Sequence, residues 1–191
     1  MGGRRGLDGL DAIETDATNC LNVPAETLEL DAPIRVKEWS LTTDSAGPGE
    51  WRGGLGVTKT FEILQDDISV NYRGERHTTS PWGSEGGTEA APTTAHISRK
   101  SGTTEHLSGK DMLTLHAGDL LTVNLSGGGG YGDSLERNPE EVAVDVRNKR
   151  VSVEAARKHY GVVLTAAKCV NHDATDALRR SIQLTESGNV K

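Results

Sequence analysis

Alternating apolar and polar positions predict a series of short β-strands from Pro33 onward. Three hairpins are expected, because three pairs of strand-like segments flank short polar or glycine-containing turns: residues 57–63 with 68–72, 95–100 with 103–107, and 112–116 with 120–125. Several short strands at this spacing are typical of an antiparallel sandwich or barrel.

Helical patterns are confined to the last third of the chain. Asn138 precedes Pro139, with Glu141 three positions after the asparagine, and this arrangement predicts a helix start. Ser152 is expected to begin a second helix that Gly161 ends, and residues 175–184 predict a weaker third. The predicted fold is therefore mainly β, an antiparallel sandwich or barrel-like domain with two or three short C-terminal helices.

The same patterns divide the chain into three parts. Residues 1–32 lack periodicity and are expected to lie on a partner, residues 33–135 form the β domain, and residues 136–191 hold the short helices and a polar tail. The β domain contains a long irregular loop, residues 74–94, and loops of this length in compact domains are usually functional or disordered.

Composition indicates a thin hydrophobic core. Only 34% of the 191 residues are hydrophobic and 23 are glycine, which buries little area and costs chain entropy on folding. We therefore expect the chain to need partner subunits for stability, as one component of a hetero-oligomer.

Charge and motif content exclude several classes of protein. The net charge is −7 without a basic face, which argues against nucleic acid, and the apolar runs are too short for a membrane span.

Cys20 and Cys169 stand far apart, so neither a disulfide framework nor a zinc site is expected and a reducing cytoplasm is the predicted location. Three histidines spaced by ten (His96, His106 and His116) could ligate a metal, but each lies on a polar strand face, so we predict exposed or interfacial side chains and no metal site.

The long loop carries the strongest candidates for chemistry. Arg73 and Arg76 could hold a carboxylate or phosphate by paired hydrogen bonds, or could simply form ion pairs with Glu75 or Glu85. Trp82, between proline and glycine, is a candidate interface anchor. Asp133 is a weaker catalytic candidate, beside flexible backbone.

The glycine run suggests a dinucleotide fingerprint, Gly127-x-Gly129-x-x-Gly132, but no helix begins after the last glycine and no P-loop lysine follows. The alternative is backbone that needs a positive φ or that passes very close to a neighbouring chain. We therefore predict that Gly128, Gly129, Gly130 and Tyr131 lie at an interface rather than at a nucleotide.

Several motifs occur together in a fixed order: Asn22-Val-Pro24, Pro33-Ile-Arg-Val36, Gly49-Glu-Trp-Arg-Gly-Gly-Leu-Gly56, Pro81-Trp-Gly83, Ser126-Gly-Gly-Gly-Gly-Tyr-Gly-Asp133, Leu135-Glu-Arg-Asn-Pro139, Asp145-Val-Arg-Asn148 and Val151-Ser-Val-Glu-Ala-Ala-Arg157. In combination they resemble the carboxyl-terminal part of hydantoinase B/5-oxoprolinase family subunits, which are related to subunits of acetone and acetophenone carboxylases. The resemblance extends from about Gly6 to Leu178.

This resemblance implies a small subunit or C-terminal portion of an ATP-dependent cyclic amide hydrolase of the hydantoinase or oxoprolinase type. It implies two partners, a hydantoinase B-like N-terminal chain and a hydantoinase A-like ATP-binding subunit. ATP, and in some members a divalent metal, would bind in those partners, so no cofactor is expected on this chain and it would not be catalytic alone. Two alternatives stay open: a subunit of a biotin-independent ketone carboxylase, and a non-catalytic assembly scaffold.

Overall fold

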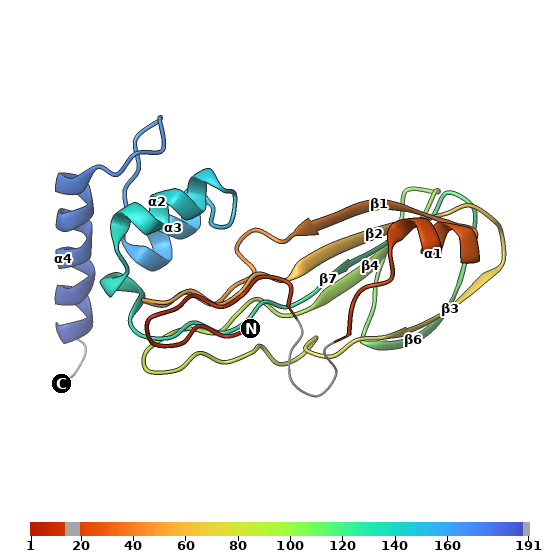
Figure 1. The fold of residues 1–191 in the computed structure, drawn as a ribbon, viewed down its shortest axis with the longest axis horizontal. Helices are drawn as coiled ribbons and strands as arrows, with labels where there is room; N and C mark the ends of the chain where they lie inside the picture. The colour runs from red at the N-terminus through yellow and green to blue at the C-terminus, as the bar shows by residue number, and fades with distance from the viewer. Residues whose placement is uncertain (14–19, 189–191) are drawn as a thin grey trace.

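The structure is a computed structural model that describes residues 1–13 and 20–188. Two antiparallel sheets form the β region (Figure 1). The larger sheet has the strand order β1 (Ile34–Leu41), β2 (Val57–Ile63), β7 (Leu120–Asn124), β4 (Thr94–Ser98) and β5 (Thr104–His106). The smaller sheet pairs β3 (Ile68–Arg73) with β6 (Lys110–Leu115). Five segments are helical: α1 (Ala25–Asp31), η1 (Ser134–Glu136), α2 (Pro139–Arg147), α3 (Val153–Tyr160) and α4 (His172–Gly188).

The two sheets pack face to face, as the sequence predicts for a sandwich. Apolar side chains from both layers meet in one cluster, with Ile63, Ile97 and Leu121 from the larger sheet and Leu115 from the smaller one. No closed barrel forms among the described strands. The mainly β, sandwich-like prediction is confirmed.

Of the three predicted hairpins, only β4–β5 is correct. β2 pairs with β1 and β7, while β3 pairs with β6, so the turns at 64–67 and 116–119 each carry the chain from one sheet to the other. The two turns lie side by side, because Ile63 N donates to Asp119 O at 2.9 Å and Gly118 N donates to Ile63 O at 2.8 Å. Ile63 and Leu115 are buried when their strands lie in opposite layers, and this burial outweighs the local preference for a hairpin.

Beyond the sandwich, a layer of irregular backbone replaces a side-chain core. We call it the glycine layer; it consists of residues 1–9, 47–54, 82–88 and 127–132. Gly128 N donates to Gly54 O at 2.8 Å and Gly130 N donates to Thr88 O at 2.9 Å, while Gly3 N donates to Gly129 O at 2.9 Å. A Cβ on Gly128, Gly129 or Gly130 would collide with the carbonyl of Met1, Trp82 or Pro48, respectively. Successive glycines thus face different neighbours, and only glycine permits that spacing.

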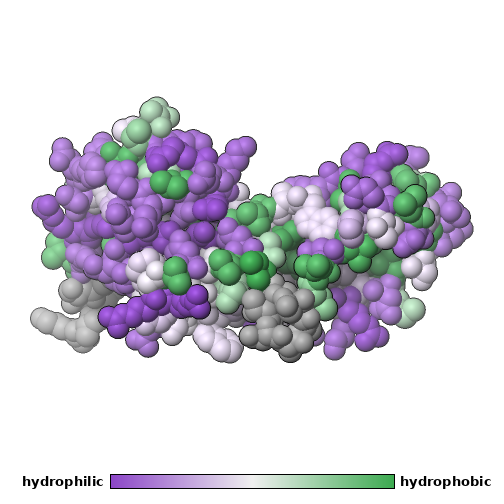
Figure 2. Space-filling view, viewed as in Figure 1, coloured by the Kyte–Doolittle hydropathy of each residue, from purple (hydrophilic) through white to green (hydrophobic). Residues whose placement is uncertain are grey.

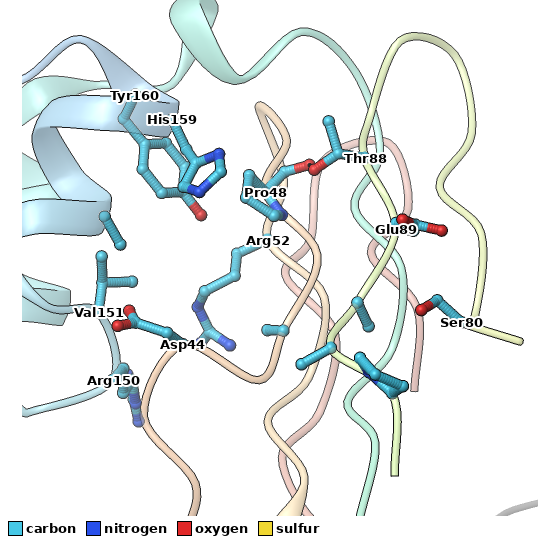
Figure 3. A pocket seen from close by; sticks show the side chains of 15 residues that line it. Asp44, Pro48, Arg52, Ser80, Thr88, Glu89, Arg150, Val151, His159 and Tyr160 are labelled. Atoms are coloured by element: carbon cyan, nitrogen blue, oxygen red, sulfur yellow. The ribbon is translucent and has the colours of Figure 1, made fainter. Parts of the chain in front are cut away.

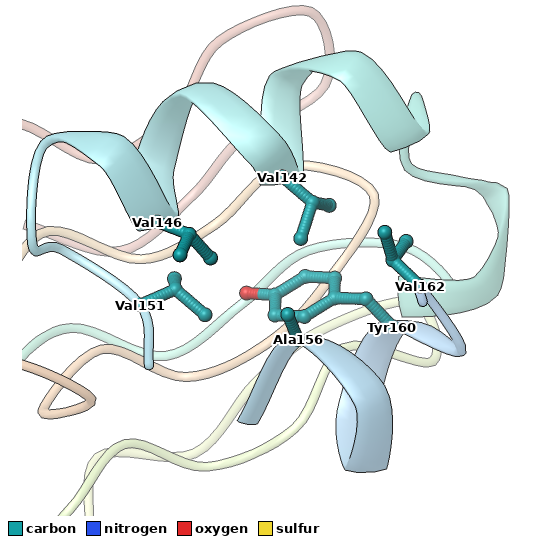
Figure 4. Packing of buried hydrophobic residues seen from close by; sticks show 6 residues of the cluster. All are labelled: Val142, Val146, Val151, Ala156, Tyr160 and Val162. Carbon is teal, nitrogen blue, oxygen red and sulfur yellow. The ribbon is translucent and has the colours of Figure 1, made fainter. Parts of the chain in front are cut away.

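The helices α2 and α3 begin and end where the sequence predicts, whereas α4 (His172–Gly188) begins earlier and ends later than the predicted 175–184 and is not short. The Asn138 side chain caps α2 by accepting from Glu140 N, with Pro139 at the first helical position. The Ser152 hydroxyl caps α3 by accepting from Ala155 N, and Gly161 ends that helix with φ 62°. Between α2 and α3 lies a second apolar cluster around the Tyr160 ring (Figure 4), formed by Val142, Val146, Val151, Ala156, Tyr160 and Val162.

Residues 1–9 belong to the glycine layer, and Ala12 continues along it, with its N donating to Leu55 O at 3.1 Å. Residues 25–31 form α1, which the sequence patterns do not indicate. Residues 14–19, within the segment expected to lie on a partner, are outside the described residues. The division at residues 32 and 135 stays a prediction. In the described part of the chain, no helix has both the length and the apolar character that crossing a membrane would need.

The distribution of hydrophobic residues on the face shown in Figure 2 bears on the expected binding to partner subunits. On this face the region of the helices is mostly hydrophilic, and hydrophobic residues appear in small separate groups around the centre and the sandwich. The exposed large hydrophobic side chains come from several regions, among them Leu30 of α1, Met112 of β6 and Trp82 of the long loop. An association surface on this face would therefore combine isolated apolar contacts with polar ones.

Candidate functional site

The predicted catalytic residues do not form one site. Arg73 lies at the exposed end of β3, opposite Lys110 of β6. Arg76, with φ 65°, stands beside the Trp82 ring, 5.9 Å from the guanidinium carbon to the ring centroid. Asp133 accepts a hydrogen bond from Leu135 N at 2.8 Å and caps η1. Among the described residues neither arginine forms an ion pair, so the expected pairing with Glu75 or Glu85 is absent there. A catalytic role for the three residues stays a prediction.

The glycine run is packed against its own chain. Gly129 and Gly130 are buried in the glycine layer, and Tyr131 forms a two-hydrogen-bond bridge with Trp51, both bonds at 2.9 Å. The backbone of residues 47–54 and 82–88 fills the space that a dinucleotide phosphate would need beside a fingerprint. Trp82, in contrast, is 77% exposed. The interface role predicted for Gly128, Gly129, Gly130, Tyr131 and Trp82 stays a prediction, and of these residues Trp82 offers the free surface.

The three histidines are divided between two places. His96 and His106 face each other across β4 and β5 with ring centroids 6.0 Å apart, while His116 lies near Asp66 and Asp67 at the sheet-crossing turns. Within residues 1–13 and 20–188, no group of three His, Cys, Asp or Glu side chains could hold a metal ion.

Sequence reasoning missed a buried ion cluster that joins distant parts of the chain. Arg137 binds Asp8 with two hydrogen bonds of 2.7 Å and binds Asp145 with one of 2.9 Å. Arg52 approaches the same oxygen of Asp145, with Nε 3.5 Å from Oδ2, and donates to Asp11 at 3.2 Å. The side chains of Arg52, Arg137 and Asp145 are only 3%, 2% and 4% exposed. Arg150 completes the cluster, 3.5 Å from Asp11 and 3.7 Å from Asp145.

The cluster contains three arginines and three aspartates, and Glu141 adds a half-exposed carboxylate 3.8 Å from Arg137. Burial raises the cost of ionising Asp8, but its hydrogen bonds and charge interaction with Arg137 prevail, and the pKa of Asp8 falls below its usual value. Burial likewise opposes the charge on Arg137, and the two carboxylates reverse this effect, so the pKa of Arg137 rises. Sequence did contain a signal: Arg52, Arg137 and Asp145 all lie in the family-like motifs. Charged residues are normally exposed, and the pattern alone does not show which ones fold inward.

Beside the ion cluster lies a pocket of about 430 Å³ (Figure 3), hereafter the α3 pocket. It opens between α3, residues 44–52 and residues 88–92 of the long loop. Its polar lining comprises Asp44, Arg52, Ser80, Thr88, Glu89, Arg150, His159 and Tyr160. Arg52 belongs both to this pocket and to the ion cluster, so the cluster holds one wall of the pocket in place.

The protonation of two side chains defines what the α3 pocket offers. Burial, with a contribution from Asp145, raises the pKa of Tyr160, so the phenol stays protonated at neutral pH. Burial, together with Lys158, lowers the pKa of His159, so the imidazole is neutral. The pocket therefore combines a phenol and a guanidinium as donors with a neutral imidazole and rim carboxylates as acceptors. Such a set can orient a small polar molecule.

Comparison with known proteins places the chain in a family. Residues 1–134 match the family described as hydantoinase B/oxoprolinase. The B-type subunit of a putative D-/L-hydantoinase from Pseudomonas sp. (strain NS671) is 35% identical over 182 residues, which are 94% of this chain and 30% of that protein.

Two solved structures resemble the fold. The ATP-dependent caprolactamase of Pseudomonas jessenii has a TM-score of 0.71 and 28% identity, covering 94% of this chain and 32% of that one. A nucleotide-free acetone carboxylase has a TM-score of 0.85 and 23% identity, covering 97% and 29%. The chain thus spans about a third of the length of these proteins. With most of its length matched to the family and a sequence relative at 35% identity, this chain belongs to the hydantoinase B/oxoprolinase family.

Proposed function

We propose that this chain is part of the hydantoinase B-like component of an ATP-dependent cyclic amide hydrolase. The observation that carries the proposal is the likeness to two proteins named for cyclic amides: the putative hydantoinase component at 35% identity and the caprolactamase at 28% identity with a TM-score of 0.71. Acetone carboxylase, at 23% identity, supports a shared fold alone. We therefore propose amide hydrolysis in preference to ketone carboxylation.

In this proposal the chain acts within a hetero-oligomer in the cytoplasm. A hydantoinase A-like partner binds ATP and phosphorylates the amide oxygen, which turns a poor electrophile into one that water can attack. The remaining, N-terminal part of the hydantoinase B-like component completes the site and holds any divalent metal. This chain binds no cofactor of its own. It supplies the rigid glycine layer and ion cluster that support the assembled site.

Reconstitution tests the proposal. The chain would be co-expressed with the hydantoinase A-like partner and the N-terminal part of the hydantoinase B-like component, and the purified complex assayed for ATP-dependent ring opening of hydantoin, 5-oxoproline and ε-caprolactam. We expect ring opening of at least one amide, with ATP consumed only when the amide is present. A complex that carboxylates acetone or acetophenone and leaves the amides intact contradicts amide hydrolysis and supports the carboxylase alternative.

A second comparison separates a contributing chain from a scaffold. The complex would be purified with the intact chain and with chains carrying Arg73→Ala or Arg76→Ala. We expect a loss of turnover without a loss of assembly for at least one of the two. Full activity in both variants favours the non-catalytic scaffold.

A further inference from the structure

The Tyr160 hydroxyl is a hydrogen-bonding group of a buried side chain and has no partner among the described residues. The Tyr160 side chain is 2% exposed, and valines of the cluster between α2 and α3 enclose its ring. Its backbone carbonyl accepts from Arg179 Nε at 3.0 Å, whereas the phenol oxygen makes no hydrogen bond to any described residue. The buried ring carries this oxygen to the wall of a cavity, where it is not enclosed and where water or a ligand can bind it.

The hydroxyl is directed into the α3 pocket. Tyr160 lines that pocket, and Figure 3 shows its oxygen pointing into the space bordered by Arg52 and His159. Arg52 lines the same space and uses Nη1 for its hydrogen bonds to Asp11 and to the carbonyl of Gly53. Among the described residues its Nη2 has no acceptor, and its Nε is buried without a hydrogen bond. Two unused donors of different chemistry therefore border one cavity.

The charges that line the pocket favour an uncharged ligand. Arg52 and Arg150 contribute two positive charges, Asp44 and Glu89 contribute two negative charges, and His159 is neutral because burial lowers its pKa. The net lining charge is thus zero. A carboxylate would add an unbalanced charge to a site where burial makes charge costly, whereas a carbonyl oxygen accepts hydrogen bonds without doing so.

We propose that the α3 pocket is a binding site for a small uncharged carbonyl compound, whose oxygen accepts hydrogen bonds from the Tyr160 hydroxyl and Arg52. A volume of about 430 Å³ accommodates a molecule of this kind with a ring or short chain. The carboxylates of Asp44 and Glu89 lie among the lining residues and can accept from an N–H group on the same molecule. This inference goes beyond the proposed function, because binding here does not depend on ATP or on which reaction the complex performs.

Tyr160→Phe isolates the hydroxyl. The substitution keeps the ring that packs between α2 and α3 and removes only the unpartnered oxygen, so the fold has no contact to lose. The probes are 2-pyrrolidinone and hydantoin as uncharged carbonyl compounds and succinate as a carboxylate, each titrated into the full chain while amide NMR shifts are followed. The control is Tyr72→Phe, which removes a hydroxyl that lies 2.8 Å from His77 Nε2, far from the pocket in the smaller sheet.

We expect saturable shifts for 2-pyrrolidinone or hydantoin at residues of the α3 pocket, with binding weakened about tenfold in Tyr160→Phe and unchanged in Tyr72→Phe. The melting temperature should change by less than about 2 °C in Tyr160→Phe and fall in Tyr72→Phe. Absence of saturable binding by both uncharged probes overturns the proposal, as does equal binding by Tyr160→Phe. Binding of succinate alone, dependent on Tyr160, overturns the assignment to an uncharged ligand. None of these results tests ring opening by the complex, so the two proposals fail separately.

Discussion

Asp8 and Arg137 lie 129 positions apart in the chain and are joined by two parallel hydrogen bonds of 2.7 Å. Arg137 also binds Asp145 Oδ2, and Arg52 Nε lies 3.5 Å from the same oxygen. These contacts connect two segments of the glycine layer, residues 1–9 and 47–54, with α2 and the residues that precede it. In a protein with a thin hydrophobic core, paired charges thus provide much of the connection between its parts.

Arg137→Met should be strongly destabilising. It leaves Asp145 buried and Asp8 without its main partner, and breaking a buried pair by removing one ion costs about 3–5 kcal/mol. We expect a loss near the lower value, about 3 kcal/mol, because Arg52 still lies near Asp145 and Asp8 is partly exposed. Urea denaturation of the purified chain measures it. Arg147→Met, an exposed arginine on α2, is the matched control and should change the stability by about 0.5 kcal/mol or less. Equal effects of the two variants would show that the ion cluster contributes little.

Stability should decrease in acid through Asp8. Its pKa is lower in the folded chain than the value of 3.8 for an unperturbed aspartate. The ionised carboxylate therefore stabilises the fold above about pH 4, and this contribution is lost as the pH falls through the lower folded pKa. Asp8→Asn should show a smaller decrease in unfolding free energy between about pH 5 and pH 3 than the unmodified chain. Asp31→Asn, at the exposed end of α1, serves as the control. An unchanged slope in Asp8→Asn would assign the acid sensitivity to other groups.

Adding a single methyl group within the glycine layer should destabilise the fold. Gly130→Ala places a Cβ against the carbonyl group of Pro48, and because that neighbour is backbone it cannot rotate away. We expect a loss of at least about 2 kcal/mol, measured by thermal denaturation. Gly2→Ala is the control, because the nearest atom to its Cβ is Gly129 O at an ordinary 3.5 Å. If Gly130→Ala melts like Gly2→Ala, the layer is more plastic than its packing indicates.

Trp82 should matter for assembly and little for folding. Its side chain is 77% exposed, and its only aromatic or cationic neighbour among the described residues is Arg76. Trp82→Ala should therefore leave the melting temperature within about 2 °C of the unmodified chain and reduce co-purification with the partner chains. Met112→Ala, 81% exposed on β6, is the matched control and should co-purify normally. Normal recovery of the complex with Trp82→Ala would remove this residue from the interface.

Local signals predicted local structure well. Asn138 and Pro139 mark the start of α2, Ser152 and Gly161 mark the ends of α3, and Ser101-Gly102 marks the one correct hairpin. These predictions succeed because each depends on hydrogen bonds or backbone angles within a few residues. The partners of β2, β3, β6 and β7 were predicted wrongly, because an alternating pattern shows that a segment is a strand and does not show which strand lies beside it.

For the candidate site, too, some features could be predicted from the sequence and others required the tertiary structure. The motifs of the sequence sufficed to indicate the family. Only the tertiary structure decided that Arg52, Arg137 and Asp145 turn inward, and that the Tyr160 hydroxyl lies at a pocket without a partner among the described residues. The physical reason is that a charged or polar side chain can be buried once another part of the chain supplies its partner, and Asp8 and Arg137, 129 positions apart, are neighbours only in the folded chain.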